Sequence, residues 1–150
     1  MHSISFMKQN EFELWNELWQ KYLKFYQTSL PDSVTKVTWE RIMDPKQNIF
    51  GFGGYWAADG TKELVGFTNF LYHSSTWSEQ GYCYLEDLYV EERFRGKGFG
   101  RLLIEAVWDD CLRKGVKRLY WKTQDKNKIA RIMYDKVAKQ SGFIEYEIEV

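Results

Sequence analysis

The segment from residue 85 to residue 103, LEDLYVEERFRGKGFGRLL, constrains the fold most, because a strand there runs into a glycine-rich turn that opens a helix. Three glycines at alternate positions let the backbone bend and let neighbouring N–H groups converge on one point. The helix N-terminus adds about half a positive charge, and Arg95, Lys97 and Arg101 add full charges. The turn is therefore expected to bind an anion of the size of a di- or triphosphate.

Spacing decides between the known phosphate-binding turns. The dinucleotide pattern G-x-G-x-x-G, started at the first of these glycines, requires glycine where Arg101 stands. A Walker pattern requires glycine at position 91 and Ser or Thr at position 98, where the chain has Glu91 and Gly98. The pattern that remains is R-x-x-G-x-G, formed by Arg95, Gly98 and Gly100.

Hydrophobic periodicity and turn signals predict the elements around this turn. Helices are expected at 9–27, 34–43, 98–114 and 127–140, strands at 3–6, 49–58, 64–72, 82–90, 116–123 and 142–150, and a polar loop at 74–81. In the second helix, Val34, Val37, Ile42 and Trp39 are expected to face inward. Hairpins join the early strands and helices join the late ones. This order predicts one α/β domain over residues 1–150, with a mostly antiparallel mixed sheet, a parallel β-α-β unit and helices on both faces.

Composition excludes several classes of protein. The chain is 44% hydrophobic and 28% charged with a net charge of zero, as in globular domains. Cys83 and Cys111 form no C-x-x-C motif, so neither a metal site nor a redox motif is expected. No stretch approaches the ~18 apolar residues of a membrane span, and the first residues lack the pattern of a signal peptide. We therefore expect a cytoplasmic protein without a membrane partner.

The charges are divided unevenly along the chain. Residues 93–139 contain 14 Lys and Arg and 5 Asp and Glu, a net charge of +9, and the remainder carries −9. The positive part contains the phosphate turn, which explains its charge without a nucleic-acid partner. Acidic residues flank the strand at 82–90, namely Glu86, Asp87, Glu91 and Glu92. Such a surface is expected to attract cationic ligands.

The strand and turn at 85–103, followed by WKTxxxNxxAxxxY at 121–134, resemble the two sequence motifs of the GNAT N-acetyltransferase superfamily. The resemblance covers about residues 47–150 closely and the two N-terminal helices in outline. Eight positions separate Tyr134 from Gly142, a longer spacing than in most of the family, as in its histone/polyamine-type subgroup. The strand that contains Glu86 also resembles that of spermidine/spermine acetyltransferases.

This resemblance implies an acetyltransferase that takes its acetyl group from acetyl-CoA and needs no metal. The pyrophosphate is expected on the N–H groups of residues 96–101 and the pantetheine arm along the strand ending at residue 90. A bulge in that strand is expected to open the cleft and to point the Leu88 N–H at the thioester carbonyl. The residues implied to bind the donor are Leu88, Tyr89, Val90, Arg95, Gly96, Lys97, Gly98, Phe99, Gly100, Arg101, Asn127 and Ala130.

Two residues are implied to be catalytic. Tyr134 matches the family's general acid, which protonates the leaving thiolate. Glu86 is the expected base, acting through a water on an amine whose pKa is near 10, and Asp87 or water alone stays open for this role. The expected acceptor is a polyamine or a basic peptide, with a small amino acid as the alternative.

Two further expectations concern the function as a whole. A non-catalytic acyl-CoA binder is the competing reading, since a binder needs the same turn but not both an acid and a base. A homodimer formed through the C-terminal strands is the expected assembly, as is frequent in this subgroup.

Overall fold

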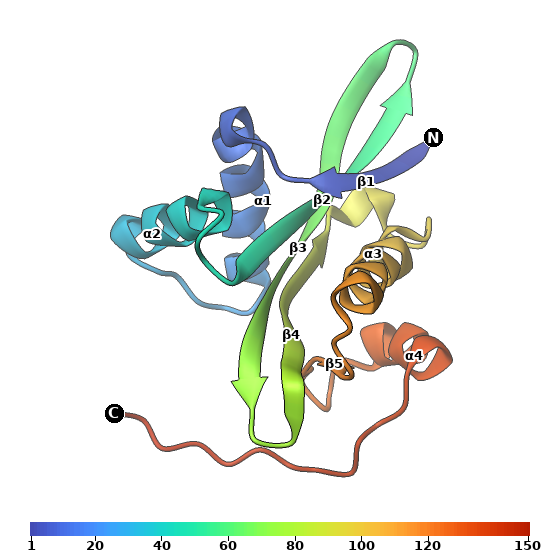
Figure 1. The fold of residues 1–150 in the computed structure, drawn as a ribbon. Coiled ribbons are helices and arrows are strands. Elements are labelled where there is room, and N and C mark those ends of the chain that lie inside the picture. The colour runs from blue at the N-terminus through green and yellow to red at the C-terminus, as the bar shows by residue number, and fades with distance from the viewer.

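The computed structural model describes residues 1–150 (Figure 1). Its elements are β1 (His2–Phe6), η1 (Gln9–Glu11), α1 (Phe12–Phe25), α2 (Asp32–Met43), β2 (Ile49–Ala58), β3 (Thr61–Ser75), β4 (Ser78–Val90), η2 (Glu92–Phe94), α3 (Phe99–Lys114), β5 (Leu119–Tyr120) and α4 (Lys128–Val137). The five strands form one sheet in the order β1-β2-β3-β4-β5. Pairing is antiparallel throughout except between β4 and β5, which are parallel. The predicted mixed α/β fold is confirmed.

Helices cover both faces of the sheet. The pair α1 and α2 lies on one face, and α3 lies on the other with α4 beside it (Figure 1). On the first face, Trp15 and Trp19 of α1 contact the ring of Phe67 in β3. On the second face, Phe70 and Leu103 belong to a separate buried cluster. The middle of the sheet is thus held between two apolar layers, which makes β3 and β4 a rigid support for a site.

Helix α2 buries Trp39 and Ile42 as predicted, but the prediction is wrong for its two valines. Val34 and Val37 are 41% and 40% exposed, whereas Thr35, Trp39 and Ile42 are buried. The indole N–H of Trp19 donates a hydrogen bond to Oγ1 of Thr35 at 3.1 Å. Because this bond satisfies the buried hydroxyl group, a threonine occupies the inner face that sequence hydrophobicity assigned to the valines.

The polar segment at 74–81, predicted as a loop, is instead the end of a tight hairpin between β3 and β4. Gly81 has φ +75°, and a Cβ built on it would lie 2.2 Å from the carbonyl oxygen of His73. The glycine therefore lets the two strands approach each other. The strand predicted at 116–123 is much shorter in the structure, since only Leu119 and Tyr120 pair with β4.

The prediction of a last strand at 142–150 is wrong. Helix α4 ends at Val137, and the chain beyond it forms neither helix nor strand and passes below the β3–β4 hairpin in Figure 1. Its apolar side chains are exposed, from 76% at Ile144 to 118% at Val150. The alternating pattern is that of a strand, but β5 is too short to give it a partner edge within the chain.

Membrane insertion through a helix finds no support in the structure, because no helix combines sufficient length and apolar content to span a bilayer.

Candidate active site

The glycine turn forms a row of free backbone donors. Gly96 and Gly98 have φ values of +76° and +90°, and α3 begins directly afterwards at Phe99. The N–H groups of residues 96–101 donate to no acceptor in the protein. The last three belong to the first turn of α3, where no carbonyl group of the helix is within reach. Six consecutive donors at a helix N-terminus make a site for an anion.

The space next to Gly96 and Gly98 is open enough for a phosphate group. A Cβ built on Gly96 or Gly98 would meet no atom within 4 Å. Of the three basic side chains predicted here, Arg101 pairs with Glu105 at 2.9 Å, whereas Lys97 is exposed and forms no ion pair. The turn therefore has the space, the donors and a free cation that a pyrophosphate requires.

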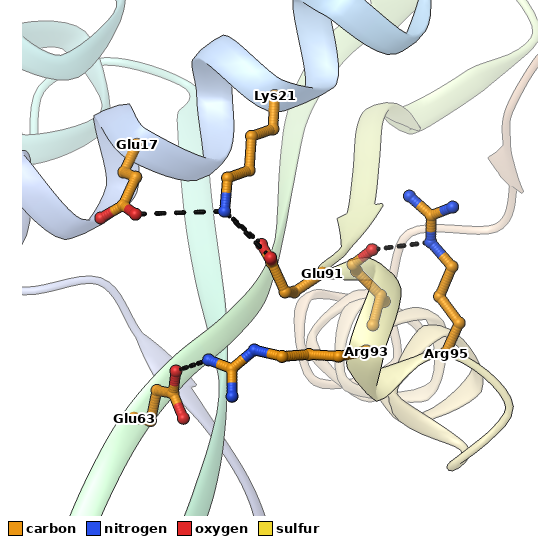
Figure 2. Close-up of polar contacts among 7 residues, drawn as sticks. Glu17, Lys21, Glu63, Glu91, Arg93 and Arg95 are labelled. Carbon is orange, nitrogen blue, oxygen red and sulfur yellow. Dashed lines mark hydrogen bonds and ion pairs between the residues drawn. The ribbon is translucent and has the colours of Figure 1, made fainter.

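Arg95 joins the turn to the sheet and to α1. Its Nε donates a hydrogen bond to the carbonyl oxygen of Val90 at 2.9 Å (Figure 2). Its guanidinium lies 5.7 Å from the ring centroid of Phe25 and 5.4 Å from that of Tyr89. Tyr89 is buried, in contact with Phe67, so its side chain belongs to the core. Its backbone pairs with Phe67 of β3, so the groups turned to the free edge of β4 are those of its neighbours Leu88 and Val90.

Strand β4 separates from β5 and leaves an open edge. The two strands pair only at Cys83–Leu119 and Tyr84–Tyr120. On the other side, Asn69 pairs with Asp87 and Phe70 pairs with Leu85, so the strand contains a bulge at Glu86. Bulges increase the local twist and redirect side chains. From residue 85 to residue 90 the edge that faced β5 is therefore free for another extended chain.

The bulge brings Asp87 into contact with α1 and β3. Asn69 Nδ2 donates a hydrogen bond to Asp87 Oδ2 at 3.0 Å, and the hydroxyl of Tyr22 is a second donor. Burial raises the pKa of Asp87 from 3.8 to about 6; the two hydrogen bonds lower it by a smaller amount, and the charge of the neighbouring Glu86 raises it slightly. The side chain of Glu86, by contrast, is exposed.

Tyr134 lies on α4. Burial and, to a smaller extent, the negative charge that Tyr26 of α1 would carry raise the pKa of its hydroxyl to about 12. Its ring meets that of Trp121 edge-on, with the centroids 5.5 Å apart. The hydroxyl therefore holds its proton at neutral pH, as a proton donor must. Burial and, to a smaller extent, the charge on Asp87 raise the pKa of Tyr26, so the three groups belong to one electrostatic cluster.

Asn127 precedes α4 at the N-cap position, but its side chain makes no capping hydrogen bond. Its Nδ2 donates instead to Thr123 Oγ1 at 3.2 Å. Ala130 follows on the first turn and is half-buried.

The acidic flank of β4 is partly neutralised, because the ammonium group of Lys21 lies 2.9 Å from the carboxylate of Glu91. Elsewhere on the sheet, Arg93 pairs with Glu63 (Figure 2).

Sequence reasoning missed two residues of the cleft, Tyr22 and Asn69. Tyr22 lies on the apolar stripe of α1 and reads as a core residue. Asn69 is the more visible signal, because it is an amide within the apolar run from Val65 to Leu71 and is only 1% exposed. Its Oδ1 has no partner, and its Nδ2 is used only by Asp87. A buried amide in an apolar strand indicates a polar neighbour across the sheet.

Potential metal ligands and nucleophiles are few. The chain has no cluster of three or more His, Cys, Asp or Glu residues arranged to hold an ion. Cys83 of β4 and Cys111 of α3 are free thiols buried in the same apolar cluster.

Comparison with known proteins gives a consistent result. The sequence matches the model of the acetyltransferase (GNAT) family over residues 12–138. It is 36% identical over 135 residues to the D-amino-acid N-acetyltransferase HPA3 of Saccharomyces cerevisiae, covering 90% of this chain and 83% of that protein. It is 34% identical over 93 residues to the thialysine N-epsilon-acetyltransferase of Caenorhabditis elegans, which covers 59% of this chain and 58% of that protein.

Among solved structures, the fold is similar to that of AAC(6')-Iy in complex with a CoA-containing bisubstrate analogue. The TM-score is 0.83 at 19% sequence identity, over 100% of this chain and 99% of that one. At this level of identity the similarity concerns the fold alone.

Proposed function

The chain belongs to the GNAT family of N-acetyltransferases, and from that membership we propose that it transfers an acetyl group from acetyl-CoA to the primary amine of a small acceptor. The observation that carries the proposal is the row of six free N–H groups at 96–101 beside the open edge of β4. The row suits a pyrophosphate. The edge suits an extended pantetheine arm that pairs with it like an added strand.

The donor is proposed to be held mainly by backbone groups. Residues 95–101 bind the phosphates, while Leu88 binds the arm through its N–H and C=O groups and Val90 through its N–H group. Tyr89 lies between them and contributes by holding this part of β4 against β3. Asn127 and Ala130 border the arm from the side of α4. Acetyl-CoA supplies the acetyl group as an activated thioester. The N–H of Leu88, which follows the bulge, donates to the thioester oxygen as negative charge develops there.

Asp87 is proposed to be the base. Sequence analysis favoured Glu86 and left Asp87 open, and the structure gives Asp87 the properties that the role requires: burial, two hydrogen-bond donors and a pKa of about 6. Asp87 removes a proton from the acceptor's ammonium group, so that the nitrogen lone pair can attack the acetyl carbon. The carbon–sulfur bond breaks, and Tyr134 gives its proton to the sulfur. The new amide nitrogen then loses its second proton to the Tyr134 phenolate, which restores the tyrosine, and Asp87 releases the first proton to solvent. Activity of Asp87→Asn and Glu86→Gln distinguishes the two carboxylates, since the larger loss of kcat identifies the base.

For the acceptor, two observations favour an amino acid over a polyamine. The names of the two relatives specify acetylation of D-amino acids and of thialysine. In addition, the ion pair of Lys21 with Glu91 weakens the acidic surface on which the expectation of a polycation depended. Glu86 and Asp87 remain beside the cleft, and they suit an amino acid that carries a second, cationic amine.

Thiol release from acetyl-CoA tests the acceptor directly. The panel consists of D- and L-lysine, ornithine, alanine, spermidine and a lysine-rich peptide. We expect the basic amino acids to have the highest kcat/KM, with a moderate fall as salt rises. A preference for spermidine at every salt concentration would contradict this choice and favour the polyamine expectation. Absence of thiol release with every amine would contradict the transferase proposal for these acceptors.

The exposed C-terminal segment supports a homodimer. Residues 143–150 alternate apolar side chains with Glu145, Glu147 and Glu149. A groove of about 620 Å³ between α3, β5 and α4 has an apolar floor that includes Trp108 and Leu119, and a cationic rim formed by Lys117, Arg118 and Lys136. We propose that the segment of one copy pairs with a second copy, because its apolar and acidic sides match this floor and rim.

A further inference from the structure

We propose that His2 is a positioning residue for the phosphates of the donor. It fixes the peptide bond between Lys97 and Gly98 so that the Gly98 N–H faces the bound anion. The inference rests on the proposed use of acetyl-CoA and adds to it a residue of β1, which lies at the opposite edge of the sheet from β5 and outside both motifs of the sequence.

The position of His2 is set by the sheet and by two aromatic rings. In the β1–β2 ladder His2 pairs with Trp56, and its ring meets that of Trp56 edge-on with centroids 5.3 Å apart. The imidazole also contacts the ring of Phe99, the first residue of α3, at 4.4 Å. These contacts direct Nε2 towards the carbonyl oxygen of Lys97, 2.7 Å away. A carbonyl oxygen only accepts, so Nε2 is the donor.

The effect on the turn follows from the geometry of a peptide bond. The chain has no cis peptide bonds, and in a trans peptide the C=O and N–H groups point in opposite directions. The carbonyl of Lys97 is tied to His2, so the N–H of Gly98 points away from β1. It meets no acceptor in the protein and belongs to the row of free donors at 96–101.

A fixed orientation matters here because the turn is intrinsically flexible. Rotation of the 97–98 peptide changes ψ of Lys97 and φ of Gly98, and Gly98 has no Cβ to restrict it. Without the hydrogen bond from His2, the peptide is free to rotate and to present its carbonyl oxygen to the anion. One hydrogen bond of ordinary strength corresponds to about a 3- to 10-fold change in the affinity for phosphate-containing ligands.

Two substitutions separate the hydrogen bond from the packing. His2→Phe keeps an aromatic ring against Phe99 but removes the donor, whereas His2→Gln keeps an N–H donor at similar reach. The dissociation constant of CoA is measured by isothermal titration calorimetry on the whole chain without an N-terminal tag. We expect a 3- to 10-fold higher Kd for His2→Phe and a value near wild type for His2→Gln.

A donor without phosphates provides the matched control. With S-acetyl-pantetheine, kcat/KM is expected to be the same in wild type and both variants, because the turn is not used. An unchanged Kd for CoA in His2→Phe would overturn the proposal, as would an equal loss in His2→Gln or an equal loss with S-acetyl-pantetheine. A wild-type chain that does not bind CoA would instead contradict the proposed function.

Discussion

Replacing Asp87 by asparagine is expected to stabilise the folded protein while it lowers activity. The rise in the pKa of this carboxyl from 3.8 to about 6 means that its ionised form destabilises the fold by about 3 kcal/mol. Asparagine has the same shape and no charge, and its Oδ1 still accepts the hydrogen bond from Asn69. Loss of the charge-assisted part of that bond offsets some of the gain. We therefore expect the free energy of unfolding to rise by about 1 to 3 kcal/mol at pH 8.

The sign and the pH window follow from proton linkage. The pKa is higher in the folded state than in the unfolded state, so the folded state binds the proton more tightly. The destabilisation by Asp87 is therefore small below pH 4, grows between about pH 4 and pH 6, and is constant above that range. At pH 5 roughly half of the difference between the wild type and Asp87→Asn should remain, and at pH 4 little of it.

Urea unfolding at pH 4, 5 and 8 measures these differences. Glu86→Gln is the matched control, because it removes the exposed neighbouring charge and should change stability by no more than about 0.5 kcal/mol. In parallel, kcat of Asp87→Asn should fall on the order of 10² to 10⁴-fold. The reasoning from burial would be refuted if Asp87→Asn were less stable than wild type at pH 8. It would also be refuted if the difference in free energy of unfolding were the same at all three pH values.

The remaining predictions concern the donor, the acid and the assembly. Gly98→Asp should abolish the rise in Tm caused by CoA. Gly60→Asp, which is also at a positive φ but in the β2–β3 turn, should keep it. An equal CoA-induced rise in Tm in both variants would contradict phosphate binding by the glycine turn. Tyr134→Phe should retain CoA affinity and lose about 10²-fold in kcat, and full activity would leave this tyrosine a packing residue only. Light scattering should give about twice 18.0 kDa and a monomer after removal of residues 142–150, whereas 18.0 kDa for the intact chain would exclude the dimer.

The order of the elements could be predicted because local signals were strong. Glycines, prolines and apolar periodicity bounded β2 and α3 to within one residue. For α2, burial of Thr35 in place of the valines could not be predicted in this way, because it depends on a partner, Trp19, that only the tertiary structure supplies. The C-terminal segment shows the converse. Its alternation has strand character, but a strand also needs a neighbouring edge, and alternation carries no information about that.

The base was hard to assign for a related reason. In a regular strand Glu86 and Asp87 point to opposite faces, and sequence alone does not show which of them faces a cleft. The bulge opposite Asn69 and Phe70 turns the backbone at this point. Burial then raises the pKa of Asp87, whereas Glu86 stays exposed. This difference arises from the packing of α1 on the sheet and not from the type of either residue.

The sequential order of the strands has a consequence for folding. From β1 to β5 each strand pairs only with strands adjacent in strand number, and β2, β3 and β4 follow one another through short turns. In the β2–β3–β4 meander many residues pair, and the paired residues are close in sequence because short turns join the strands. Contacts of this kind form quickly, so the meander is expected to form early. The β4–β5 junction, with two paired residues, is the least secured part of the sheet. Amide hydrogen exchange should therefore show α4 and β5 opening locally while the meander remains protected, so the half of the cleft formed by α4 can open and close on a preformed wall.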